Sequence, residues 1–274
     1  MRLAKGKDQK MEKSIIFCFT GTGNSLKVAK DIASSLGECG IYDMGQPIPE
    51  TDFSEYGRIG FVFPVYFLGL PLQVANFIGE LSFPPDFSGF IFSIATYANM
   101  HGVAVKLVDE LLRKQGKRLD YAANIKMGDN AIAFYGSTPN LDRLASSYKK
   151  HMNALIPEIR EKAKSSLGAK FLPAVMYYNA VIPGMTSRDK GFQLTGDCSL
   201  CGICEKVCPV DNIELSDRKP DFKHGCEQCM ACIQLCPEKA IDYKGKCAKR
   251  NRYMNPDISI EDLIEFHSIG CMWM

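Results

Sequence analysis

The 274-residue sequence has little net charge, because 33 lysines and arginines nearly balance 31 aspartates and glutamates. No global field therefore attracts nucleic acid or an anionic membrane, and nucleic acid is not an expected partner. The sequence also lacks any run of 18 apolar residues that could span a membrane as a helix. Residues 1–13 are polar and basic and lack the apolar core of a secretory signal, so the sequence predicts a cytoplasmic protein.

Cysteine, in contrast, is abundant, and its distribution is uneven. Eight of the twelve cysteines lie between residues 198 and 236. Because the sequence shows no export signal, disulfides are not the expected state of these cysteines. The run Cys198-x2-Cys201-x2-Cys204-x3-Cys208-Pro209 recurs 28 residues later, from Cys226 to Pro237. This spacing and its duplication indicate metal ligation.

A [4Fe-4S] cube needs four thiolates at tetrahedral corners, and a Cys-x2-Cys-x2-Cys run supplies three of them. In bacterial runs of this kind the cysteine before the proline binds the other cluster. The sequence therefore predicts two [4Fe-4S] clusters, one held by Cys198, Cys201, Cys204 and Cys236, the other by Cys226, Cys229, Cys232 and Cys208. Zinc is the alternative, but it requires neither the third cysteine nor the Cys-Pro.

Short apolar runs alternate with helical patterns in the first part of the chain. Strands are predicted over 14–20, 58–63, 90–96 and 119–127, and helices over 25–36, 72–81, 103–115 and 141–166. This alternation predicts an α/β fold with a doubly wound parallel sheet. We expect one domain over 14–167, a packed connector over 168–196, the cysteine-rich domain over 197–247 and a C-terminal tail over 248–274.

The loop between the first predicted strand and helix has the composition of a phosphate site. It reads Thr20, Gly21, Thr22, Gly23, Asn24 and Ser25. Amides at a helix start, with threonine and serine hydroxyls, bind phosphate, although the same residues also make ordinary capped turns. Leu26 stands where the dinucleotide fingerprint needs its third glycine, so a terminal phosphate fits better than a pyrophosphate.

The loop resembles the flavodoxin phosphate loop, Ser/Thr-x-Thr-Gly-x-Thr, with Ser25 in the last position. The resemblance implies a flavodoxin-like fold and bound FMN, whose ring lies between two later loops. The candidate ring contacts in those loops are Pro64, Val65, Tyr66, Thr96, Tyr97, Asn99 and Gly102. The tyrosines fall at the carboxyl edge of predicted strands, where open α/β sheets bind ligands, although such aromatics also serve as packing. Gly21 and the absence of a tryptophan from these loops depart from the family pattern.

Together the two modules resemble the flavodoxin-ferredoxin fusion proteins of anaerobic bacteria and archaea, over residues 14 to about 247. The resemblance implies a flavodoxin-like FMN domain followed by a small α+β dicluster ferredoxin domain. It also implies an electron-transfer protein that passes electrons between FMN, two [4Fe-4S] clusters and external redox protein partners.

Two other functions stay open at this point. An FMN-dependent oxidoreductase could act on a quinone or a nicotinamide and use the clusters as a wire, since flavin chemistry needs few protein groups. No general acid, nucleophile or substrate motif stands out, which favours the electron carrier. A redox sensor is the third hypothesis, but the sequence contains no evident DNA-reading element.

Overall fold

The protein is described by a computed structural model that covers residues 12–134, 140–217 and 219–274. Its central sheet has the strand order β10-β2-β1-β3-β4-β5. These strands are β1 (Ser14–Cys18), β2 (Cys39–Asp43), β3 (Arg58–Pro64), β4 (Phe90–Tyr97), β5 (Tyr121–Lys126) and β10 (Cys271–Trp273). All pair in parallel except β10, which is antiparallel to β2. The order 2-1-3-4-5 is that of the flavodoxin-like fold, so the predicted α/β fold with a mostly parallel sheet is confirmed.

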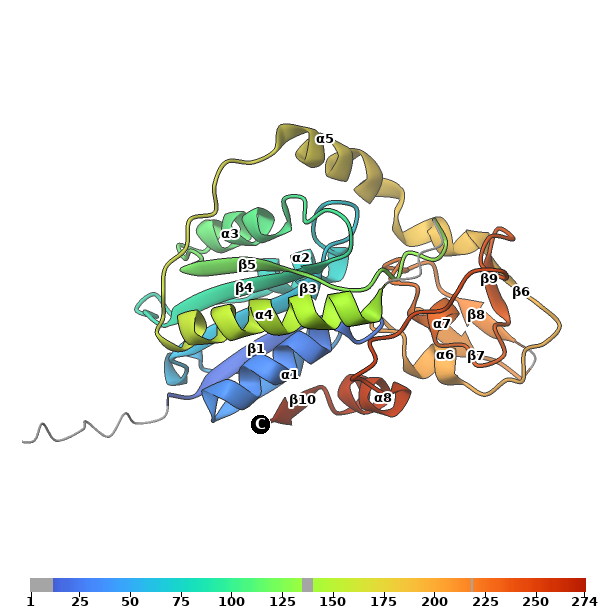
Figure 1. Cartoon of the computed structure of the whole chain (residues 1–274), viewed down its shortest axis with the longest axis horizontal. Coiled ribbons are helices and arrows are strands. Elements are labelled where there is room, and N and C mark those ends of the chain that lie inside the picture. Colours follow the sequence, from blue (N-terminus) through green and yellow to red (C-terminus); the bar gives the residue numbers. More distant parts are fainter. Residues whose placement is uncertain (1–11, 135–139, 218) are drawn as a thin grey trace, which may run out of the picture.

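Helices cover both faces of the sheet. Helices α1 (Asn24–Leu36) and α4 (Leu141–Arg160) lie on one face, and α2 (Leu72–Glu80) and α3 (Ala104–Lys114) lie on the other (Figure 1). The central strands are therefore buried on both sides, and every residue of β1 is buried. This double cover explains why the central strands are continuous apolar runs rather than alternating patterns.

Two strands of the sheet were not predicted from the sequence. Strand β2 has five residues and contains Gly40, and β10 has only three residues, so neither has a readable alternation. Strand β10 follows α8 (Ile260–Ile269) and pairs Met272 with Ile41 on the edge of the sheet. The segment interpreted as a tail thus contributes a strand to the first module.

The cysteine-rich module consists of short elements beside the sheet (Figure 1). Its strands are β6 (Phe192–Leu194), β7 (Ile213–Leu215), β8 (Pro220–Phe222) and β9 (Ile241–Tyr243), and its helices are α6 (Ile203–Lys206) and α7 (Ala231–Gln234). The pairs β7–β8 and β6–β9 are antiparallel. Strand β6 comes from the predicted connector, which also forms α5 (Leu172–Val181).

The sequence repeat of this module recurs in its backbone. Left-handed residues follow the same positions in both halves, at Leu200 and Gln228 and again at Gly202 and Met230. The amide four residues after each Cys-Pro cysteine donates to its sulfur, from Asn212 to Cys208 and from Ala240 to Cys236, at 3.3 Å in both cases. Among the described residues, no helix combines the length and apolar character needed to cross a membrane.

Candidate functional site

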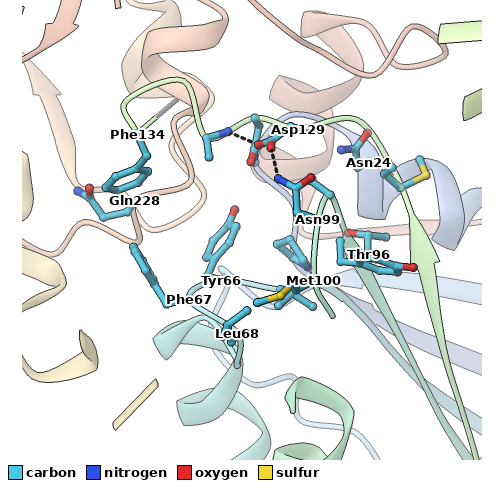
Figure 2. A pocket seen from close by; sticks show the side chains of 18 of the residues that line it. Asn24, Tyr66, Phe67, Leu68, Thr96, Asn99, Met100, Asp129, Phe134 and Gln228 are labelled. Carbon is cyan, nitrogen blue, oxygen red and sulfur yellow. Dashed lines mark hydrogen bonds between the residues drawn. The ribbon is translucent and has the colours of Figure 1, made fainter. Parts of the chain in front are cut away.

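A cavity of about 630 Å³ opens beside the ends of β1, β3, β4 and β5. Its size falls within the range of about 300–1,000 Å³ that is usual for small-molecule sites. Eleven predicted flavin contacts line it: Thr20, Gly21, Thr22, Asn24, Ser25, Pro64, Val65, Tyr66, Thr96, Tyr97 and Asn99. Figure 2 shows Asn24 and Thr96 at one end of the cavity and Phe67, Phe134 and Gln228 at the other.

The Thr20–Ser25 loop lines this cavity with hydroxyl side chains at the start of α1. Gly23 has a φ of 90° and leads into α1, whose first turn receives no side-chain cap. The Thr22 hydroxyl is buried and has no hydrogen-bond partner among the described residues, whereas the Ser25 hydroxyl lies 2.9 Å from that of Thr96. A buried polar group without a partner costs free energy, and a phosphate oxygen would satisfy it. The residues present therefore fit a phosphate.

The two predicted ring loops are held together by their backbones. Phe67 and Leu68 adopt left-handed conformations, with φ values of 49° and 66°, and the Val103 amide donates to the Leu68 carbonyl over 2.8 Å. Gly102 has a φ of 55° and lies so close to Leu68 that a Cβ atom would collide with its backbone. Gly102 thus joins the ring loops and is not among the lining residues.

Residues 127–131, Phe134 and parts of the connector also line the cavity, and sequence analysis predicted none of these contacts. Asp129 accepts a hydrogen bond of 3.2 Å from the Asn99 side chain (Figure 2). The Arg188 guanidinium lies 5.1 Å from the centre of the Phe67 ring. The rule that ligands bind at the carboxyl edge of parallel strands could have indicated the loop after β5. No sequence signal indicated Arg188.

The C-terminal segment supports the phosphate loop from outside the cavity. The Tyr253 hydroxyl donates to the Asn24 side-chain oxygen over 2.8 Å, and the Asn255 amide donates to the Thr22 carbonyl over 2.9 Å. A Cβ atom on Gly23 would lie 2.9 Å from the Cβ of Ile258. Gly23 therefore contacts this segment and does not line the cavity.

The eight predicted cluster ligands gather around two smaller cavities. One is lined by Cys198, Cys201, Cys204 and Cys236, and the other by Cys208, Cys226, Cys229 and Cys232. We call the second group the near set, because Gln228 within its loop also lines the large cavity, and the first group the far set. Cys226, Cys229 and Cys232 of the near set are buried, whereas Cys201 of the far set is exposed.

Burial makes the metal-free thiols weak acids. It raises the pKa of Cys226 to about 12 and that of Cys204 to about 11. The pKa values of Cys229 and Cys232 are raised well above the usual value for the same reason. Iron binds thiolates, so assembling a cluster here would release protons from these cysteines. Among the described residues, no group of three or more His, Cys, Asp or Glu side chains is arranged to hold a single metal ion.

Comparison with known proteins gives partial similarities. The chain matches no protein-family model. Over 63 residues it is 33% identical to one component of the ion-translocating oxidoreductase complex of Methanosarcina acetivorans. The matched stretch is 21% of this chain and 24% of that protein, so the chain spans about a quarter of the length of this relative.

Two solved structures are similar to the chain at low scores. Rubredoxin oxygen:oxidoreductase from the anaerobe Desulfovibrio gigas has a TM-score of 0.30 and 16% identity, covering 54% of this chain and 37% of that one. The Trp repressor binding protein from Bacillus subtilis has a TM-score of 0.36 and 14% identity, covering 56% of this chain and 99% of that one.

The arrangement as a whole joins a cavity with a phosphate-type loop to a set of four cysteines. Gln228 lines the cavity and lies one residue before Cys229 of the near set. Tyr66 lies between the two, since it lines the cavity and its hydroxyl lies close to Gly21, which is in turn next to Cys229. Burial raises the pKa of Tyr66 well above its usual value, so its hydroxyl stays neutral.

Proposed function

We propose that this chain is an electron-transfer protein that binds FMN in the large cavity and a [4Fe-4S] cluster at each cysteine set. The single observation that carries the proposal is Gln228, which lines the cavity and donates from its backbone and side-chain amides to the Cys226 sulfur of the near set, at 3.3 Å in both cases. A flavin accepts or gives one or two electrons, whereas a cluster transfers one. Adjacent sites for both would convert paired electrons into single ones.

The cavity residues support FMN as the flavin. The Thr22 hydroxyl and the start of α1, which have no side-chain partner in the described part of the chain, suit a terminal phosphate. Tyr66 and Tyr97 line the cavity from the two ring loops and offer aromatic surfaces to an isoalloxazine ring. The oxidoreductase name of the Methanosarcina acetivorans relative also supports a redox role.

The external partner is proposed to be a redox protein that exchanges electrons at the far set. This set is the more accessible one, since Cys201 is exposed and Cys198 and Cys236 are partly exposed. Leu200, between the first two of these cysteines, exposes 37% of its surface. An apolar side chain beside a partly exposed cluster would suit a transient protein contact.

A second candidate function is an FMN-dependent oxidoreductase that reduces a quinone or oxidises a nicotinamide. The observation that favours it is the aromatic mouth of the cavity, where Phe171 is 62% exposed and Tyr177 is 48% exposed. Such side chains could stack on a flat substrate ring. Rapid flavin reduction by a nicotinamide, or turnover of a quinone, would favour this function over the carrier.

The test of the proposed function begins with the cofactors. Protein reconstituted without oxygen should hold about eight irons and eight acid-labile sulfides. It should also release a flavin that is identified as FMN by its fluorescence and chromatographic mobility. Zinc in place of iron, or FAD in place of FMN, would contradict the proposal.

The crossed ligand assignment has its own test. Cys208→Ala should remove mainly the cluster that is bound by Cys226, Cys229 and Cys232, although Cys208 follows the first run in sequence. Cys236→Ala, the matched variant in the other half, should remove the far cluster. Electron paramagnetic resonance of the reduced variants would distinguish the two clusters, and loss of the far cluster in Cys208→Ala would refute the assignment.

A further inference from the structure

Glu227 connects the near set to the first module. It lies between Cys226 and Gln228, is only 4% exposed, and its two carboxyl oxygens accept hydrogen bonds from the amides of Leu72 and Gln73 at 2.9 and 2.6 Å. These amides begin α2, and α2 has no cap from its own preceding residue, Pro71. A residue of the cysteine-rich module therefore caps a helix of the flavodoxin-like module.

Helix α2 follows directly after the ring loop that contains Tyr66. Only residues 67–71 separate this tyrosine from Leu72, and Tyr66 and Gly69 close that segment through two backbone hydrogen bonds of 2.8 and 3.1 Å. The cap by Glu227 thus ties the loop of the near set to the loop that forms one wall of the cavity.

Gly21 allows a second close approach. A Cβ atom at Gly21 would lie 2.9 Å from the Cβ of Cys229 and 3.2 Å from its carbonyl oxygen. Any larger residue would push the backbone of Cys229 away from the phosphate loop. The glycine at the variable position of the loop, which departs from the flavodoxin pattern, is therefore explained by contact with a ligand of the near set.

Asn130 forms the third connection, from the loop after β5. Its side-chain amide donates to the Cys229 carbonyl over 3.1 Å, and its own carbonyl accepts from the Gln234 side chain over 2.8 Å. Cys229, Ala231 and Leu235 also pack in the same apolar core as the central strands. The residues that line the far set's cavity all fall between 198 and 241.

We propose that Glu227 is a positioning residue that fixes the near cluster beside the flavin cavity, which makes the near cluster the direct redox neighbour of the flavin and the far cluster the outlet. This inference rests on the proposed function. In each transfer, one electron leaves the reduced flavin and reduces the near cluster. The same electron then moves to the far cluster and on to an external one-electron redox protein. Two such transfers oxidise the flavin fully, and its protons pass to water.

The sequence repeat supplies a substitution that a cluster loop can tolerate. Ser199 occupies in the far loop the position that Glu227 occupies in the near loop, 28 residues later. Glu227→Ser therefore removes the carboxylate while giving the near loop a residue that the far loop already has. Glu227→Gln keeps one acceptor oxygen, and Glu214→Gln, at an exposed acid of the same module that lines neither cysteine cavity, controls for loss of one charge.

The measurement is electron transfer from photoreduced flavin to the clusters, followed by stopped-flow absorbance in reconstituted protein. In the unmodified protein the rate should be independent of protein concentration. In Glu227→Ser it should be about tenfold slower or more, because the near loop loses both hydrogen bonds to α2 and the near cluster is no longer held in one position beside the flavin. Glu227→Gln should be intermediate, and Glu214→Gln should be unchanged.

Two further readouts separate the possible failures. Hydrogen exchange of the Leu72 and Gln73 amides should be faster in Glu227→Ser, even in metal-free protein. The iron content, the FMN content and the reduction potentials of both clusters should stay as in the unmodified protein. Faster exchange with an unchanged transfer rate would overturn the inference and leave Glu227 as a helix cap alone. Unmodified protein that binds no FMN or no clusters would instead refute the proposed function.

Discussion

At the scale of single residues, the hydroxyl of Thr22 is the sharpest pointer to a phosphate. It is buried and lacks a partner in the part of the chain that the structure describes. Thr22→Ala should lower FMN affinity about tenfold, because a phosphate loses one charge-assisted hydrogen bond, and should leave riboflavin affinity unchanged. Quenching of flavin fluorescence on titration with apoprotein measures both affinities.

Ser93→Ala is the matched control for Thr22→Ala. The Ser93 hydroxyl is also buried and without a partner among the described residues, but it lies within β4 and does not line the cavity. Its removal should change neither affinity. Equal weakening of FMN and riboflavin by Thr22→Ala would mean that the phosphate binds elsewhere.

The sequence alone indicated the two cysteine sets and the phosphate-type loop as candidate sites, because their chemistry depends on residue type and short spacing. The sequence could not indicate roles for Asn130, Arg188 or Glu227, because each of them contacts a residue that is distant in the chain. Gly21 illustrates the limit. The sequence marks it as unusual, and only its approach to Cys229 gives the reason.

At the scale of elements, the apolar patterns of the central strands and their helices were predictive, whereas the short strands β2 and β10 were not predicted. The central strands and α1, α2 and α3 lie close to their predicted ranges. Helix α4 ends at Arg160, six residues before the predicted end at 166. Lys162 adopts a left-handed conformation with a φ of 55°, and Ser165 then donates to the Asp120 carbonyl over 2.9 Å. A tertiary contact thus overrides helix propensity in this stretch.

The edge strand β10 should stabilise the sheet measurably. The Trp273 ring packs on Gly40 of β2, where a Cβ atom would lie 3.3 Å from the ring, and the Lys13 ammonium lies 5.5 Å from the ring centre. Trp273→Ala should lower the free energy of unfolding by about 1–2 kcal/mol, less than for a fully buried tryptophan, because the residue is 52% exposed. Denaturant unfolding followed by far-ultraviolet circular dichroism checks this value.

Met274→Ala is the control for the same edge, because Met274 is a similarly exposed apolar residue at 47% but follows the strand. It should change the stability by less than about 0.5 kcal/mol, as is usual for surface positions. An equal loss in both variants would mean that the packing on Gly40 contributes nothing specific.

At the scale of the whole molecule, the order of the chain hides how its parts are joined. The C-terminal segment returns to the phosphate loop through Tyr253 and Asn255 and then to the sheet edge through β10. The connector gives β6 to the second module and lines the cavity of the first. The two modules are therefore separate in sequence but joined in the structure by several buried contacts.

This integration predicts that the holoprotein unfolds as one cooperative unit. Three probes report on different parts of the molecule. Release of FMN reports on the cavity, and loss of visible absorbance reports on the clusters. Emission of the single tryptophan, Trp273, reports on the β10 edge of the sheet. Because Glu227, Asn130 and Gly21 join the modules through buried contacts, the three transitions should coincide in the unmodified protein. The midpoints are compared at one scan rate under anaerobic conditions, since cluster loss is irreversible.

In Glu227→Ser the cluster absorbance should be lost at a lower temperature than the tryptophan signal changes, because the near loop has lost its hydrogen bonds to α2. Separate transitions in the unmodified protein would mean that the modules behave as independent domains and that the buried contacts between them add little stability.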